Sequence, residues 1–188
     1  MQLILWSNAE AEDEAGSDFV RALTRKGNRQ VAQMAAWLKA QPRIDFKPWK
    51  TLVNPARRAR QTAAELDTTS GIQFETVASI ALKATSDVIL RAVKWLGSAT
   101  NVIVVGHQPT LDLVIAKLLN GHDEPFSAGS VSVKKGEMWC FKTRWFATRR
   151  FETLTINRDK NYQIILRAMA TPDTVTGEAL KTLLETLT

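Results

Sequence analysis

Three short stretches of the sequence place polar or basic side chains directly after an apolar run. They are Ser7-Asn8, Asn54-Pro55-x-x-Arg58 and Gly106-His107. A guanidinium group forms charge-assisted, bidentate hydrogen bonds with oxyanions, and an imidazole near neutral pH can donate a proton or act as a base. The free N–H groups at the start of a helix attract the same kind of ligand. Together these residue types favour a site for a phosphate-like anion.

The second stretch carries three neighbouring arginines, Arg57, Arg58 and Arg60. We predict Asn54 as the N-cap of a helix and Pro55 as its first residue, because both residue types are favoured at those positions. Arg58 then lies in the opening turn. The simplest alternative is that all three belong to a solvated helix surface. A helix does not place three such close neighbours on one side, however, so we expect at least one of them to point into the site.

The third stretch follows residues 102–105, four consecutive β-branched residues that predict a central strand buried on both faces. His107 stands just past the end of this strand, and Thr110 is the predicted cap of the next helix. A strand end, a glycine and a helix start together form the geometry at which α/β proteins bind anions. The alternative is a histidine with a purely structural role.

The remaining elements follow from the spacing of apolar residues. Buried strands are predicted at 1–6 and 49–53, and helices at 27–40 (capped by Thr24), 55–66, 86–96 (ended by Gly97), 111–119 and 177–187. A short strand is expected within 72–79, and alternating segments at 130–143, 151–156 and 162–169 predict antiparallel strands at the sheet edge. We therefore predict an α/β fold, a three-layer sandwich with a mostly parallel central sheet and an antiparallel edge, in one domain over residues 1–188.

The composition argues against several classes of protein. Of the residues, 45% are hydrophobic and 23% are charged, as in a globular protein, and we expect neither a membrane span nor a signal peptide. The single cysteine, Cys140, is predicted to be buried, excludes an internal disulfide and fits a reducing, cytoplasmic compartment. His122 is expected in an exposed turn. The net charge of +6 is spread over many segments, so nucleic-acid binding is not predicted, and neither is a metal site or a cofactor.

Four motifs, in their order along the chain, resemble the histidine phosphatase superfamily of phosphoglycerate-mutase-like proteins, and within it the SixA-type phosphohistidine phosphatases. They are Trp6-Ser7-Asn8-Ala9-Glu10-Ala11, Asp18-x-x-Arg21-x-Leu23-Thr24-x-x-Gly27, Val53-Asn54-Pro55-x-x-Arg58-Ala59-x-Gln61-Thr62 and Val104-Val105-Gly106-His107-Gln108-Pro109. In that family the first motif reads Arg-His-Gly or Arg-His-Ala. Its histidine attacks phosphorus, while two arginines and a second histidine surround the phosphoryl group.

The resemblance implies a role for individual residues of this chain. Arg58 matches the helix arginine and His107 the second histidine, whereas Ser7 stands in the place of the first arginine and Asn8 in the place of the nucleophile. A carboxamide nitrogen is effectively non-basic, so Asn8 cannot form a phosphoenzyme. Many members also carry a carboxylate proton donor after the middle strand, and residues 79–83 contain no acid.

The implied function is therefore the binding of phosphate, or of a phosphorylated protein or small molecule, with impaired catalysis. The binding residues would be Ser7, Asn8, Arg58 and His107, with Arg21 at the rim unless it only pairs with Asp18. One alternative is an active phosphatase that uses an atypical nucleophile or direct water attack. Another is a basic interaction module with a vestigial pocket. The oligomeric state does not follow from the sequence.

Overall fold

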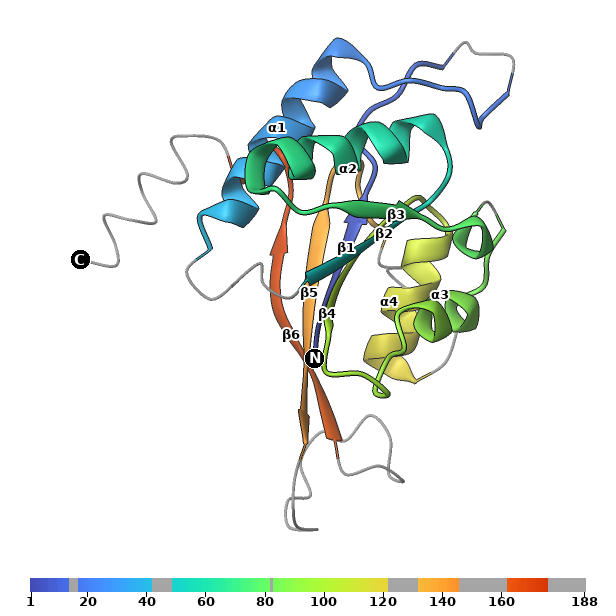
Figure 1. Ribbon diagram of the computed structural model, residues 1–188, viewed down its shortest axis with the longest axis vertical. Coiled ribbons are helices and arrows are strands. Elements are labelled where there is room, and N and C mark those ends of the chain that lie inside the picture. The colour runs from blue at the N-terminus through green and yellow to red at the C-terminus, as the bar shows by residue number, and fades with distance from the viewer. Residues whose placement is uncertain (14–16, 42–48, 82, 122–131, 146–161, 176–188) are drawn as a thin grey trace, which may run out of the picture.

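The computed structural model describes residues 1–13, 17–41, 49–81, 83–121, 132–145 and 162–175. Six strands form one mixed sheet in the order β3-β2-β4-β1-β5-β6 (Figure 1). The strands are β1 (Gln2–Ser7), β2 (Trp49–Val53), β3 (Phe74–Thr76), β4 (Asn101–Gly106), β5 (Met138–Trp145) and β6 (Tyr162–Ala170). The helices are α1 (Arg25–Lys39), α2 (Arg57–Ser70), α3 (Ser86–Ala92) and α4 (Thr110–Asn120), with a short 3-10 turn η1 (Ala78–Ile80).

The pairing of the strands sets one functional edge of the sheet. Strands β1, β2 and β4 run parallel, with Ser7 opposite Gly106 and Val53 opposite Val105. Strand β5 pairs antiparallel with β1, and β6 pairs antiparallel with β5. The carboxyl ends of β1, β2 and β4 therefore meet at one edge. The predicted α/β fold, with a mostly parallel sheet and an antiparallel edge, is confirmed.

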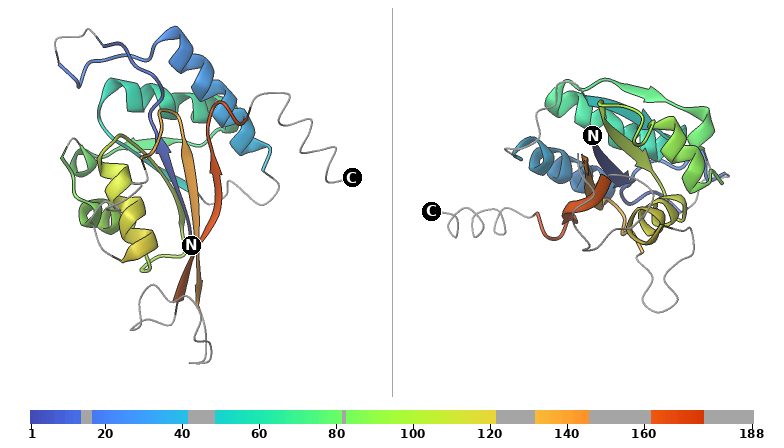
Figure 2. Two further views of the ribbon diagram at one scale, coloured as in Figure 1. Left: turned by 180° about the vertical axis from the view of Figure 1, so that it is seen from behind. Right: turned by 90° about the horizontal axis from the view of Figure 1, so that it is seen from below.

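Helices cover both faces of the sheet (Figure 2). Side chains of successive strand residues point to opposite faces, so Ile4 and Trp6 of β1 pack with the residues of α1 and α2. Leu3 and Leu5 pack instead with the residues of α3 and α4. The central strands are therefore buried between two apolar clusters, one on each face of the sheet. Among the described residues, no helix is long and apolar enough to cross a membrane.

The starts of the helices agree with the sequence in one case and differ in two. Thr24 caps α1 as predicted, since its hydroxyl accepts a hydrogen bond from the Gly27 N–H at 2.9 Å. Asn54 is not the N-cap of α2, which begins at Arg57 after Ala56. Thr110 is the first residue of α4 rather than its cap. The side chain of Asn54 instead forms hydrogen bonds with Ile80, in η1, and with His107, just after β4.

Three predicted elements have different lengths in the structure. The helix expected over 86–96 ends at Ala92, because Lys94 and Leu96 adopt positive φ angles of 51° and 66° that a right-handed helix cannot include. The strand expected within 72–79 is limited to β3 and is followed by η1. Of the alternating segment 130–143, the described part from 132 onward becomes strand at Met138, after a turn with Gly136 at φ +78°.

The last of the alternating segments, 162–169, is confirmed as β6. The predicted strand at 151–156, the helix at 177–187 and His122 lie outside the described residues. Cys140 is buried in β5, and burial raises the pKa of its thiol to about 12. Cys140 is therefore the buried structural thiol that the sequence predicted.

Candidate functional site

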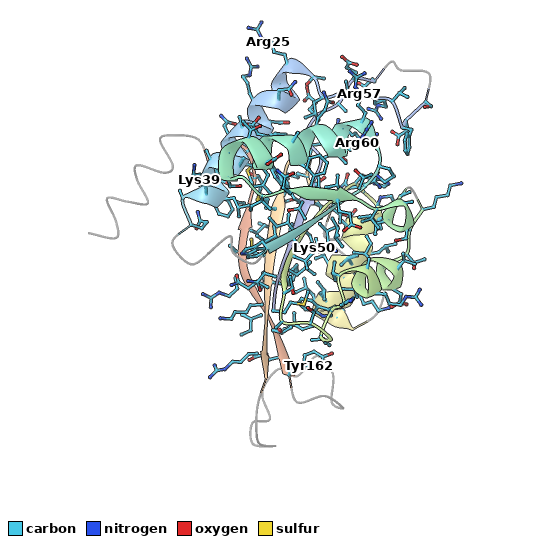
Figure 3. All side chains as sticks on the ribbon, viewed as in Figure 1. Arg25, Lys39, Lys50, Arg57, Arg60 and Tyr162 are labelled. Carbon is cyan, nitrogen blue, oxygen red and sulfur yellow. The ribbon has the colours of Figure 1, made fainter. Side chains whose placement is uncertain are left out.

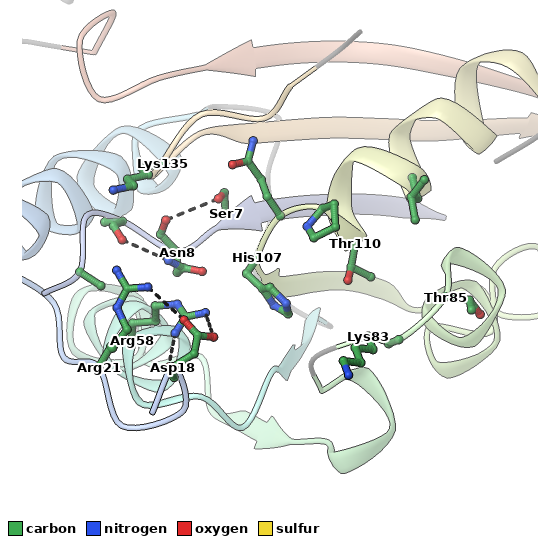
Figure 4. Close-up of a pocket in the computed structure, with 16 residues that line it drawn as sticks. Ser7, Asn8, Asp18, Arg21, Arg58, Lys83, Thr85, His107, Thr110 and Lys135 are labelled. Carbon is green, nitrogen blue, oxygen red and sulfur yellow. Dashed lines mark hydrogen bonds and ion pairs between the residues drawn. The ribbon is translucent and has the colours of Figure 1, made fainter. Parts of the chain in front are cut away.

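A cavity of about 470 Å³ lies at the carboxyl edge of the sheet. Its walls come from the end of β1, the loop before α1, the start of α2, the loop before α3, the β4–α4 junction and the turn before β5 (Figure 4). The polar and charged residues that line it are Ser7, Asn8, Asp18, Arg21, Arg58, Lys83, Thr85, His107, Gln108, Thr110 and Lys135. All five candidate residues from the sequence are thus brought to one cavity.

Arg58 is the member of the arginine cluster that lines the cavity. Its side chain is nearly buried, whereas Arg57 and Arg60 are exposed on the same helix (Figure 3). The guanidinium Nη2 donates to Asp18 Oδ2 at 2.8 Å, and Nη1 donates to the Asp18 carbonyl oxygen. Two of the five guanidinium N–H groups are therefore engaged by Asp18, which leaves three for other acceptors.

Arg21 forms the salt bridge with Asp18 that the sequence offered as an alternative, and it also lines the cavity. Its Nη1 lies 3.0 Å from Asp18 Oδ1, and its Nη2 lies 3.0 Å from Asp13 Oδ1. The hydrogen bond from Arg58, assisted by Arg21, lowers the pKa of the Asp18 carboxyl below its usual value. Asp18 belongs to a motif visible in the sequence, but its place inside the cavity was missed because nothing local shows that it contacts Arg58.

His107 has one tautomer that fits its surroundings. Asn54 accepts the Ala56 N–H with Oδ1 at 2.9 Å and donates to the Ile80 carbonyl with Nδ2 at 2.8 Å, so the orientation of its amide is determined. The same Nδ2 lies 3.2 Å from His107 Nδ1, which must therefore accept. The ring proton is then on Nε2, which becomes the donor for a ligand. The pKa of His107 is lowered, mainly by burial and secondarily by the charge of Arg58, so the neutral form is favoured.

This network predicts the titration of His107. We expect the pKa of His107 to lie below the value of about 6.5 for a free imidazole. When the pH falls below that free value, the unfolded chain takes up the proton before the folded chain does. Acidification should therefore lower the free energy of unfolding. Replacing Asn54→Asp should raise the pKa above 6.5, because a carboxylate would accept from a protonated Nδ1. The chain has two histidines, so ¹H–¹⁵N NMR titration of the His122→Gln background isolates His107. An unchanged pKa in Asn54→Asp would contradict this hydrogen-bond assignment.

Ser7 is the last residue of β1 and Asn8 follows it, and both line the cavity. The Asn8 N–H donates to the Gly106 carbonyl at 2.9 Å, which joins the ends of β1 and β4. The Asn8 side chain donates from Nδ2 to the Ala9 carbonyl at 3.1 Å, and its Oδ1 has no hydrogen-bond partner among the described residues. The Ser7 hydroxyl makes a long contact of 3.4 Å with the Asn8 carbonyl. Both side chains are nearly buried, so their positions are closely defined.

The lining of the cavity carries an excess of positive charge. The described lining residues include a single carboxylate, that of Asp18, and four positively charged side chains: Arg21, Arg58, Lys83 and Lys135. The two lysines were missed by the sequence reasoning, because each comes from a loop with no motif. The 79–83 segment adds Lys83 and no acid to the wall, as its sequence indicated. No group of three or more metal-ligating side chains occurs in the part of the chain that the structure describes.

Comparisons with known proteins show which family the chain belongs to. No protein-family model matches the chain. Among curated proteins it is similar to the phosphohistidine phosphatase SixA of Escherichia coli (strain K12), with 31% identity over 130 residues, 66% of this chain and 78% of the relative. A solved structure of the protein histidine phosphatase SixA complexed with tungstate matches with a TM-score of 0.67 and 22% identity over 94% of this chain and 100% of that one. The alpha-ribazole phosphatase from Shigella flexneri matches with a TM-score of 0.62 and 16% identity, over 92% and 97%.

Proposed function

Since this chain belongs to the SixA family of the histidine phosphatase superfamily, we propose that it binds a phosphorylated group in the cavity without forming a covalent phosphoenzyme. The observation that carries the proposal is the position of Asn8. It directly follows β1 and lines the same cavity as Arg58 and His107, at the place where the family motif has the nucleophilic histidine. The cavity keeps the groups that hold an anion and lacks the group that attacks it.

The anion-binding half of the proposal rests on the donors that surround the cavity. Arg58 has three guanidinium N–H groups beyond those engaged by Asp18, and His107 offers its Nε2–H. Arg58 also sits in the first turn of α2, where the positive end of the helix dipole favours a negative ligand. Tungstate, the ligand of the SixA structure, is likewise a tetrahedral oxyanion. The cavity is open rather than filled by side chains, which argues against a vestigial pocket.

The second half of the proposal rests on the side chains at the ends of β1 and β4, none of which presents an activated nucleophile to the cavity. The lone pair of the Asn8 amide nitrogen is delocalised and does not attack phosphorus. The Nδ1 lone pair of His107 accepts from Asn54, and its Nε2 carries the proton. The Ser7 hydroxyl is buried without a base as its hydrogen-bond partner. Asp18, with a lowered pKa, is a weak base for activating water.

A binding experiment tests the proposal directly. Orthophosphate is titrated into the protein by isothermal calorimetry, and we expect it to bind. Replacing Arg58→Gln should weaken binding by roughly 10- to 100-fold, from about 1.5–3 kcal/mol for a hydrogen bond to a charged group. Arg60→Gln, an exposed arginine on the same helix, is the matched control and should leave affinity unchanged. No binding to the protein as it stands, or equal affinity in Arg58→Gln with an intact circular dichroism spectrum, would overturn the proposal.

A further inference from the structure

The cavity contains one feature that an anion site does not require, the carboxylate of Asp18. We propose that Asp18 makes the cavity selective for a phosphoryl group that carries a proton, so that the ligand is a phosphomonoester in its singly charged form. This inference rests on the proposed function and adds to it the protonation state of the ligand. It assigns to Asp18 a specificity role, with the P–OH of the ligand donating a hydrogen bond to the carboxylate.

The geometry brings the ligand and the carboxylate together. Asp18 Oδ2 lies 2.8 Å from Arg58 Nη2, and Oδ1 lies 3.0 Å from Arg21 Nη1. The Asp18 side chain is 39% exposed and lines the cavity, so each oxygen keeps a lone pair that is not used by an arginine. An oxyanion that accepts from the remaining N–H groups of Arg58 must lie beside Asp18, because the same guanidinium group would contact both the carboxylate and the oxyanion.

The charge of Asp18 then discriminates between ligands. Arg58 and Arg21 keep the carboxyl ionised, so it accepts hydrogen bonds and repels negative charge at short range. A doubly charged phosphomonoester has no proton to share and meets the full repulsion. The singly charged form removes one negative charge and supplies the donor that the carboxylate needs. A sulfate ester has the same single charge and nearly the same shape, but no proton to donate.

The other charged or titratable groups of the cavity do not reproduce this effect. The groups that line it with Asp18, from every surrounding element, are Arg21, Arg58, Lys83, Lys135 and His107. The positive arginines and lysines attract a doubly charged ester more strongly than a singly charged one, so they do not produce a preference for the singly charged form. Burial and the charge of Arg58 lower the pKa of His107, and any protonation of it at low pH would strengthen the binding of phosphate and sulfate esters alike. Only the proton on the ligand separates the two esters.

The test compares phenyl phosphate with phenyl sulfate in equilibrium calorimetric titrations at about pH 5 and about pH 8. The second pKa of a phosphomonoester is about 6, so the singly charged form falls from about nine-tenths of the ligand to about one-hundredth. We expect phenyl phosphate to bind at least ~10-fold more weakly at the higher pH, and at the lower pH to bind at least ~10-fold more tightly than phenyl sulfate. Asp18→Asn should reduce the pH effect to less than ~3-fold, because the neutral amide tolerates both forms.

Each outcome separates this inference from the function on which it rests. Binding of phenyl phosphate with equal affinity at both pH values, or equal binding of the two esters at low pH, would overturn the role of Asp18 and leave the phosphate site standing. Failure of both esters to bind at either pH would overturn the proposed function and this inference with it. The comparison of the two esters uses the unaltered protein, so it decides the question even if Asp18→Asn does not fold.

Discussion

Replacing Ser7→Arg together with Asn8→His should raise the rate of dephosphorylation of a phosphohistidine substrate by at least ~10²-fold, as expected for restoring a catalytic group. The amide Nδ2 of Asn8 and the Nδ1 of a histidine occupy equivalent positions, one bond from Cγ. The existing 3.1 Å bond from Nδ2 to the Ala9 carbonyl would therefore be taken over by Nδ1–H. That bond would leave the lone pair on Nε2, the nitrogen farther from the backbone, free to attack phosphorus. The added arginine supplies a second guanidinium for the phosphoryl oxygens.

The two single replacements serve as matched controls for the double one. Ser7→Arg adds positive charge without a nucleophile, so it should strengthen anion binding and leave the rate near its starting value. Asn8→His should yield a phosphoenzyme, detected by mass spectrometry after alkaline quenching, whereas Ser7→Arg should not. A protein that is already as fast as the double variant would contradict the proposed loss of covalent catalysis. Phosphate trapped on His107 would contradict the tautomer described for it.

Replacing Gly27→Ala should lower the free energy of unfolding by about 3 kcal/mol or more, the upper end of the range for overpacking a rigid site. A Cβ at Gly27 would lie 2.0 Å from the carbonyl oxygen of Glu10, which is a backbone atom. Neither partner can easily move away. The Glu10 carbonyl accepts the Thr24 N–H at 3.0 Å, and the Gly27 N–H donates to Thr24 Oγ1 at 2.9 Å. The glycine of this motif is therefore explained by the close approach of α1 to the loop that follows β1.

Gly97→Ala is the matched control for this replacement. A Cβ at Gly97 would have the Lys94 carbonyl oxygen as its nearest neighbour, at 3.6 Å, which is an ordinary contact. Its expected effect is within about 0.5 kcal/mol, as for most surface substitutions. Urea unfolding, followed by tryptophan fluorescence, compares the two variants with the parent protein. Similar midpoints for Gly27→Ala and Gly97→Ala would refute the packing argument.

The fold could be predicted from the sequence because its signals are local. The β-branched run before Gly106 and the apolar run before Ser7 identify buried strands without any knowledge of their neighbours. Thr24 identifies the start of α1 for the same reason, since a cap contacts the residues next to it. The prediction of Asn54 as an N-cap was wrong, because its amide is engaged by Ile80 and His107, which lie 26 and 53 residues away.

The candidate site was likewise predictable where its features are local in the sequence. The types of Ser7, Asn8, Arg58 and His107, and their places at strand ends and at a helix start, are properties of the sequence alone. Parallel pairing then brings the strand ends to one edge whenever such a sheet forms. The sequence thus determined which chemical groups are present at this edge.

The tertiary structure decided what those groups can do. Only in the folded chain does the Asp18 carboxylate accept a hydrogen bond from Arg58. Folding also places the Asn54 amide next to the His107 ring. It brings Lys83 and Lys135 to the same cavity. These contacts join loops that are far apart in sequence, and hydrogen-bond direction and charge depend on distances of a few ångströms that no local pattern encodes. The protonation state of His107 and the charge that an incoming ligand meets therefore emerge with the fold.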